Sequence, residues 1–274
     1  MMLPTVRSIF RGKQVKEEGI LIERSFEQVQ IDRRMLEAYA QFMNFESSSP
    51  MSYLYILAQR AQLAVMLEPS FTIAIPGMIH LSNDLEQLNE VNFDTPFDLK
   101  VDIQVPYKSE GALIPKLEVN FWQVDQLVAR CVSTYYVKRK KKRAKKPPKK
   151  EETPMIQADY SEDWDLHSLL GKQYAKVSGD SNPIHTSKLF ARLMGFKSSF
   201  IHGWYSVSRI VRTVEQITNR SFQKIEVAFK SPVYLPSEQT LVFEKEADDS
   251  IFFQLKESTT DKLTLEGVLK SSHF

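Results

Sequence analysis

Hydrophobic and polar positions along the chain follow two periods, and each period occurs in both halves. A period of two, or a short apolar run, marks the segments expected to be strands. These segments are 99–105, 117–121, 128–137, 225–229, 241–243, 251–255 and 263–265. Such alternation is typical of antiparallel strands that bury one face. The pattern therefore predicts two β-rich units.

Apolar residues that recur every three or four positions predict the helices of the first half. One amphipathic helix is expected over 31–42 and a buried helix over 51–67. The second follows a Ser-Ser-Ser-Pro segment at 47–50, whose serines are expected to cap it.

Two helices are also predicted in the second half. The first begins at Thr186, ends near Gly195, and is expected to pack through Leu189, Phe190, Leu193 and Met194. The second is long and runs from near His202 to Ile217. Each half therefore places a long helix before its main run of strands.

Composition fits a folded chain with a substantial core. The 274 residues are 42% hydrophobic and 11% aromatic, enough for one large or two modest domains. The single cysteine, Cys131, lies in a strand-like apolar run, so an intrachain disulfide is excluded and a reducing cytoplasm is expected. The N-terminus does not follow the pattern of a secretory signal, and no apolar run approaches about 20 residues, which argues against a membrane span.

The richest candidate chemistry lies in the segment 178–185, Ser-Gly-Asp-Ser-Asn-Pro-Ile-His. Its Gly and Asn-Pro predict a turn, which allows Asp180 and His185 to converge on one small object. A carboxylate and an imidazole that share a water have the groups needed to add water to a double bond or remove it. A purely structural alternative makes Asp180 and Asn182 Asx-turn residues and His185 a packed histidine.

A second candidate segment begins at His202. The long helix starts there, so free backbone N–H groups around Gly203 are expected to point out of its positive end. Such donors suit a thioester oxygen that gains negative charge. We expect His202 to cap the helix or to hydrogen-bond a neighbour. A metal site of Asp180, His185 and His202 is a further alternative, but no cysteine cluster or H-E-x-x-H spacing supports it.

These two motifs together resemble those of the MaoC-like hydratases and dehydratases, the (R)-specific enoyl-thioester hydratases of the hotdog fold. The resemblance rests on Y-A-x-x-S-G-D-x-N-P-I-H from Tyr174, on the later G-F-x-x-x-x-I-H-G, and on the K-I-E-V-A-F-K-S-P-V strand, and covers roughly residues 160–270. It implies a double hotdog of the α+β class, with antiparallel sheets that each wrap around a long helix. We expect the reaction to need no cofactor and no metal.

The resemblance also assigns roles to residues. Asp180 and His185 hold and activate the catalytic water, Asn182 supports the loop, and the Gly203 amide contacts the oxyanion. The residues expected to contact substrate are Ser178, Tyr174, His202 and Trp204. Trp204 departs from the family pattern, in which a smaller or more flexible residue is commoner.

The domain hypothesis places a degenerate hotdog at 1–137, a polybasic linker at 138–154 and the catalytic hotdog at 155–274. The first half has no counterpart of the motif, since only Phe-Glu-Ser-Ser-Ser separates Asn44 from Pro50. It is therefore expected to lack catalytic groups and to widen the acyl groove, or to act only as a scaffold. Two fused units satisfy an exposed sheet edge within one chain, so a monomeric pseudo-dimer or a homodimer is expected.

The segment 138–150 holds ten basic residues and no acidic one, and removing them from the formal net charge of +2 leaves −8. A run of like charges with a Pro-Pro pair predicts an extended, solvated linker. Attraction to the phosphates of coenzyme A, to an acyl carrier protein or to nucleic acid is the alternative. Nucleic acid is the weakest of these, because no stacking aromatic residues are interleaved with the charge.

The predicted activity is reversible hydration of a trans-2-enoyl thioester, carried by coenzyme A or acyl carrier protein, to an (R)-3-hydroxyacyl thioester. Dinucleotide, P-loop and serine-hydrolase motifs are absent from the sequence. Two alternatives stay open: a thioesterase on the same fold, and a non-catalytic protein that binds acyl groups or polyanions.

Overall fold

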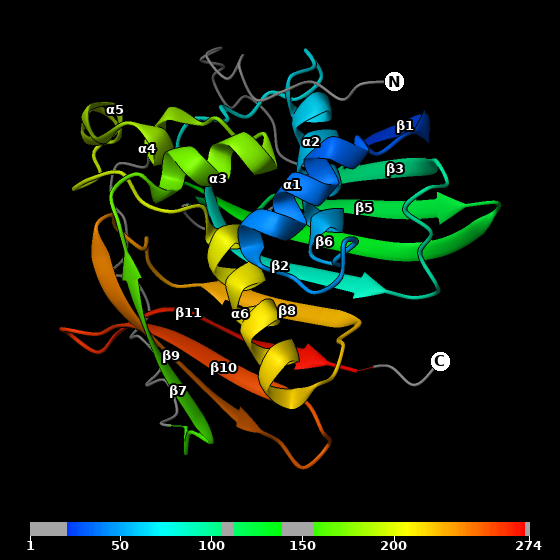
Figure 1. The fold of residues 1–274 in the computed structure, drawn as a ribbon. Helices are drawn as coiled ribbons and strands as arrows, with labels where there is room; N and C mark the ends of the chain where they lie inside the picture. Colours follow the sequence, from blue (N-terminus) through cyan, green and yellow to red (C-terminus); the bar gives the residue numbers. More distant parts are fainter. Residues whose placement is uncertain (1–20, 106–111, 139–155, 272–274) are drawn as a thin grey trace.

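The computed structural model describes residues 21–105, 112–138 and 156–271, and its two halves repeat one order of elements (Figure 1). The first half comprises β1 (Leu21–Val29), α1 (Arg33–Met43), α2 (Tyr53–Met66), β2 (Ile79–Gln87), β3 (Phe97–Gln104), β4 (Ala112–Leu113), β5 (Lys116–Gln123) and β6 (Gln126–Lys138). The second comprises β7 (Tyr160–Leu166), α3 (Leu170–Ser178), α4 (Pro183–Thr186), α5 (Lys188–Leu193), α6 (Gly203–Thr218), β8 (Lys224–Phe229), β9 (Ser237–Lys245), β10 (Ile251–Glu257) and β11 (Lys262–Lys270).

One antiparallel sheet runs through both halves in the order β1-β3-β5-β6-β2-β8-β11-β10-β9-β7, and β4 pairs with β6. The order is symmetric about its centre, where β2 of the first half pairs with β8 of the second. In that pair Leu85 lies opposite Ile225. The two units thus satisfy one another's edge, and the predicted α+β double hotdog is confirmed.

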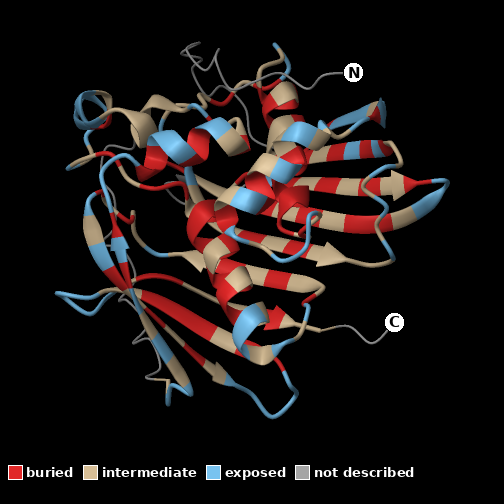
Figure 2. Ribbon diagram, viewed as in Figure 1, coloured by how far each residue is buried: buried red, intermediate tan, exposed pale blue. Residues whose placement is uncertain are grey.

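The core lies between the sheet and the two long helices. α2 is buried on nearly all sides, as its apolar sequence requires, whereas α6 buries one face and exposes Ile217 near its C-terminal end (Figure 2). The predicted long helices over 51–67 and 202–217 are both present, although α2 begins at Tyr53. Its N-cap residue, Ser52, makes no capping hydrogen bond through its side chain, so the expected serine cap is wrong.

The predicted packed helix from Thr186 is also different in the structure. A short turn, α4, holds His185, and α5 covers only Lys188–Leu193. Leu189 and Leu193 are 72% and 76% exposed, so the expected packing face is wrong. Gly195 does stop the helix, because it adopts a positive φ of 91° just after the C-cap.

The sequence patterns missed the two outermost strands, β1 and β7. Both are sheet edges with charged residues on their exposed positions, which hides the period of two. They also missed β2, where the buried polar residue Asn83 interrupts the apolar pattern.

From residue 139 to 154 the polybasic linker lies outside the described residues. Within the described ranges, no helix is long and apolar enough to cross a membrane.

Replacing Leu85 with alanine tests the β2–β8 junction. Leu85 is fully buried beside Ile225, so we expect Leu85→Ala to lower the free energy of unfolding by about 2–5 kcal/mol. Urea denaturation followed by circular dichroism measures the change. Leu189→Ala, at an exposed position, is the matched control and should stay within about 0.5 kcal/mol of wild type. An equally small effect at Leu85 would contradict the packing described.

Candidate active site

The loop after α3 holds Asp180 through a series of local hydrogen bonds. Gly179 ends α3 in the left-handed region, with φ of 75°, and the Asp180 N–H then donates to Ser178 Oγ at 3.2 Å. The Asn182 N–H donates to Asp180 Oδ1 at 3.1 Å, while Asn182 Oδ1 accepts from the Ile184 N–H at 3.3 Å. The Asx-turn geometry is therefore present, and it fixes the carboxylate of Asp180 in place.

His185 lies on α4, and its protonation can be inferred from its neighbour. Its Nδ1 lies 2.9 Å from the Phe200 carbonyl oxygen, which can only accept a hydrogen bond. Nδ1 therefore carries the hydrogen in the neutral ring, and Nε2 is left as a proton acceptor. Burial, together with the adjacent His202, lowers the pKa of His185 to about 3. The ring is thus neutral at physiological pH.

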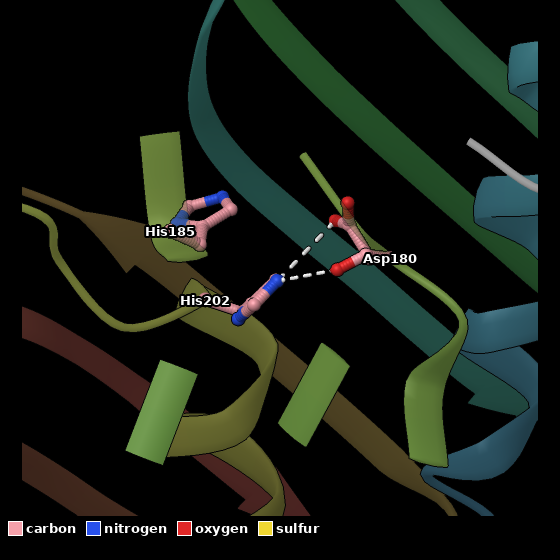
Figure 3. Close-up of side chains that lie close together, drawn as sticks. All are labelled: Asp180, His185 and His202. Carbon is pink, nitrogen blue, oxygen red and sulfur yellow. Dashed lines mark hydrogen bonds and ion pairs between the residues drawn. The ribbon is translucent and has the colours of Figure 1, made fainter. Parts of the chain in front are cut away.

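His202 immediately precedes α6 and holds the Asp180 loop (Figure 3). Its Nε2 donates to the Asp180 backbone oxygen at 2.9 Å, whereas the distance to Asp180 Oδ2 is 3.9 Å, too long for a hydrogen bond. Its ring centroid lies 3.9 Å from that of His185. Burial lowers the pKa of His202, so it acts as a neutral donor. This matches the expected bond to a neighbour, although the side chain does not cap the helix.

Asp180 is 7% exposed, and the surroundings of its carboxylate favour the ionised form. Burial alone raises the pKa of such a group. The facing imidazoles of His202 and His185, the Asn182 N–H and the Gln59 amide oppose this effect and hold the pKa of Asp180 below its ordinary value. A carboxylate beside a neutral imidazole is therefore the resting state of the pair at neutral pH.

A cavity of about 540 Å³ collects most of the predicted site residues. Asp180, Asn182, His185, His202, Gly203, Trp204 and Tyr174 all line it. Ser178 is not among the lining residues; its Oγ donates to the Tyr174 backbone oxygen and accepts from the Asp180 N–H. Ser178 therefore stabilises the loop and does not line the cavity.

Gly203 and Trp204 form the first turn of α6 at the cavity wall. A side-chain carbon on residue 203 would lie 2.7 Å from Cε1 of Phe229, so only glycine fits there without displacing that ring. Trp204 stacks on Tyr55 with ring centroids 4.0 Å apart, and its Nε1 donates to the Ser52 backbone oxygen at 2.8 Å. The unusual tryptophan thereby joins α6 to the start of α2.

The first half contributes to the cavity in ways that the sequence did not reveal. Tyr55, Gln59, His80 and Tyr135 line it, and the Gln59 Nε2 donates to Asp180 Oδ2 at 2.9 Å. We expected the first half to supply no catalytic groups, and that expectation did not foresee the direct contact between Gln59 and Asp180. The available signal was a group of three polar residues, Gln59, Arg60 and Gln62, in an otherwise apolar helix.

The three side chains Asp180, His185 and His202 offer ligand atoms within 4.8 Å of one another, a spacing that a metal ion can bridge. The hydrogen-bond pattern does not favour such a site. His202 Nε2 already donates its hydrogen to the Asp180 backbone oxygen, and that bond would have to break before Nε2 could bind a cation.

The fold and the paired carboxylate and imidazole define a hotdog protein with a polar site beside the junction of its halves. Residues 143–268 match the family model described as MaoC like domain. It is 22% identical over 214 residues to 3-hydroxyacyl-thioester dehydratase X of Mycobacterium tuberculosis, covering 77% of this chain and 76% of that protein.

Two solved structures share the fold over nearly the whole chain. HtdX of Mycobacterium tuberculosis aligns with a TM-score of 0.76 and 21% identity, over 92% of this chain and 100% of that one. A MaoC-like dehydratase from Phytophthora capsici aligns with a TM-score of 0.73 and 17% identity, over 92% of this chain and 95% of that one.

Metal removal tests the hydrogen-bond interpretation of the three-residue cluster. We expect dialysis against EDTA to leave the thermal unfolding midpoint unchanged, because His202 Nε2, the ring nitrogen that faces Asp180, already donates to the Asp180 backbone oxygen. Differential scanning calorimetry before and after dialysis, with metal analysis of the protein as purified, measures this. A bound equivalent of zinc, lost together with stability, would contradict the expectation.

Proposed function

We propose that the protein is a hydro-lyase that interconverts trans-2-enoyl thioesters and (R)-3-hydroxyacyl thioesters. The observation that carries the proposal is the convergence of Asp180 and His185 in one cavity, both as proton acceptors, beside the N-terminus of α6. The MaoC-like domain and the similarity to a protein named 3-hydroxyacyl-thioester dehydratase support the same activity. The R configuration is proposed from the family resemblance.

A water between the two acceptors explains the chemistry. It donates one hydrogen to the Asp180 carboxylate and one to His185 Nε2, which leaves an oxygen lone pair free to attack the β-carbon of the enoyl group. One of these acceptors takes the water's proton as the carbon–oxygen bond forms. The same proton then passes to the α-carbon, so the pair returns to its starting state and no cofactor is consumed.

The backbone at the start of α6 stabilises the intermediate charge in this proposal. As the β-carbon is attacked, negative charge moves onto the thioester oxygen. The Gly203 N–H is in the first turn of a helix, where it has no partner within the helix, and it lines the same cavity as Asp180. Hydrogen bonding to this amide therefore lowers the barrier most where the charge is greatest.

The cavity supports the proposed substrate class. Lined by aromatic and aliphatic side chains from both halves, it suits an acyl chain with its polar thioester at the Asp180 end. Coenzyme A and acyl carrier protein both present such a thioester on a pantetheine arm, and both are proposed carriers.

Loss of the conjugated enoyl-thioester absorbance tests the activity directly. Wild type should hydrate crotonyl-CoA or a longer trans-2-enoyl-CoA, and chiral analysis should identify the R product. Asp180→Asn and His185→Ala should each lower kcat/KM by about 100-fold or more, because each removes an acceptor of the attacking water. Leu189→Ala, on the exposed side of α5, is the control and should retain wild-type activity.

The same reaction mixtures separate hydration from thioester hydrolysis. Release of free thiol without loss of the enoyl absorbance would identify a thioesterase and overturn the proposed function. Equal activity in wild type and both variants would remove Asp180 and His185 from the mechanism.

The pH dependence should reflect the acceptor state of the pair. Burial lowers the pKa of His185 to about 3, and the pKa of Asp180 lies below its ordinary value, so both groups lose their acceptor form only on acidification. We expect kcat/KM to be flat from about pH 5 to pH 8 and to fall only below about pH 4. An acid limb near pH 6.5, the ordinary pKa of histidine, would show that the imidazole titrates as an exposed ring.

A further inference from the structure

α2 belongs to the first half, yet it holds the proposed catalytic loop of the second half at two successive residues. The Arg60 Nη2 donates to the Ser178 backbone oxygen at 3.1 Å, and the Gln59 Nε2 donates to Asp180 Oδ2 at 2.9 Å. Arg60 also packs on Gly179, where an added side-chain carbon would come within 2.6 Å of Nη2. The loop and this helix are therefore fitted closely together.

The contact with Asp180 is chemically specific. A carboxylate only accepts hydrogen bonds, so the Gln59 amide must present its NH₂ group to it. The backbone N–H of Asn182 occupies Oδ1, and Gln59 occupies Oδ2. With one donor on each oxygen, the plane of the carboxylate is fixed, and the remaining lone pairs are available to a water in the cavity that both Gln59 and Asp180 line.

We propose that Gln59 is a positioning residue of the active site, through which the first half takes part in catalysis. This inference rests on the proposed hydratase activity for its kinetic consequences. Gln59 orients Asp180 toward the water and keeps it ionised, since a donor to the charged form favours that form. It touches Asp180, not the reacting atoms, and acts through that residue.

Two substitutions of Gln59 separate this role from simple packing. Gln59→Leu keeps much of the volume but removes the donor, and should lower kcat/KM on the order of 10- to 100-fold, mostly in kcat, by releasing the carboxylate from its orientation. It should also move the acid limb of the pH–rate profile to higher pH. Gln59→Glu places a like charge against Asp180 and should move that limb further in the same direction.

A glutamine elsewhere in the same half provides the matched control. Gln41 is exposed on α1, and Gln41→Leu should leave both kcat/KM and the pH profile as in wild type. Thermal unfolding of all variants, followed by circular dichroism at each pH, ensures that the comparison is made on folded protein. A kcat/KM loss at Gln59 with an unmoved acid limb would assign it a packing role and overturn the inference.

A direct titration keeps the inference testable even if the enoyl thioester is not the substrate. Carbon-13 NMR of protein labelled at the aspartate carboxyl carbons, with Asp180→Asn to assign the resonance, reports the ionisation of Asp180 without turnover. The Asp180 resonance should titrate at higher pH in Gln59→Leu than in wild type. An identical titration in the two proteins would refute the Gln59–Asp180 coupling and leave the proposed hydration untouched. Inactive wild type with a shifted titration would refute only the hydration.

Discussion

The pairing of β2 with β8 is the constraint on which the rest of the structure depends. Each half has an exposed strand that cannot stay unpaired at low cost, and the two strands satisfy one another in the middle of one sheet. Both long helices lie over that sheet (Figure 1), and the start of α2 contacts the start of α6 through Trp204 and Ser52. The cavity lies beside this contact, so its walls belong to both halves.

The electrostatics of the site follow from that arrangement. Burying an ionised carboxylate is costly unless hydrogen bonds compensate, and Asp180 receives one from its own loop and one from the other half. The two histidines give their available hydrogens to backbone oxygens, which fixes the orientation of each ring, and burial lowers the pKa of both so that the rings stay neutral. The result is a rigid pair of hydrogen-bond acceptors rather than an ion pair that neutralises itself.

The local sequence around Asp180 and His185 predicted that part of the site, whereas the contribution of Gln59 depends on a long-range contact. Gly179, Asn182 and Pro183 specify a turn by their own conformational preferences, so the approach of Asp180 to His185 was readable from spacing. Gln59 lies 121 positions from Asp180, and the polar residues of its apolar helix do not indicate which distant residue it contacts. The fold shows the same division: the alternating strands and long helices were predicted, whereas the charged edge strands and the exposed face of α5 were set by their position in the sheet and on the surface.

The corresponding positions of the two long helices show how the halves have diverged. Gln59 is the seventh residue of α2, and Arg209 is the seventh residue of α6. Gln59 reaches across the junction to a carboxylate, whereas Arg209 stays within its own half, paired with Glu162 at 3.4 Å and stacked on Trp164 at 4.2 Å. The first half offers no catalytic loop between Asn44 and Pro50 for Arg209 to support. The polar residue at this position of each helix thus agrees with whether the opposite half has a loop for it to contact. A site built by both halves therefore explains the difference between Gln59 and Arg209 better than a site built by the second half alone.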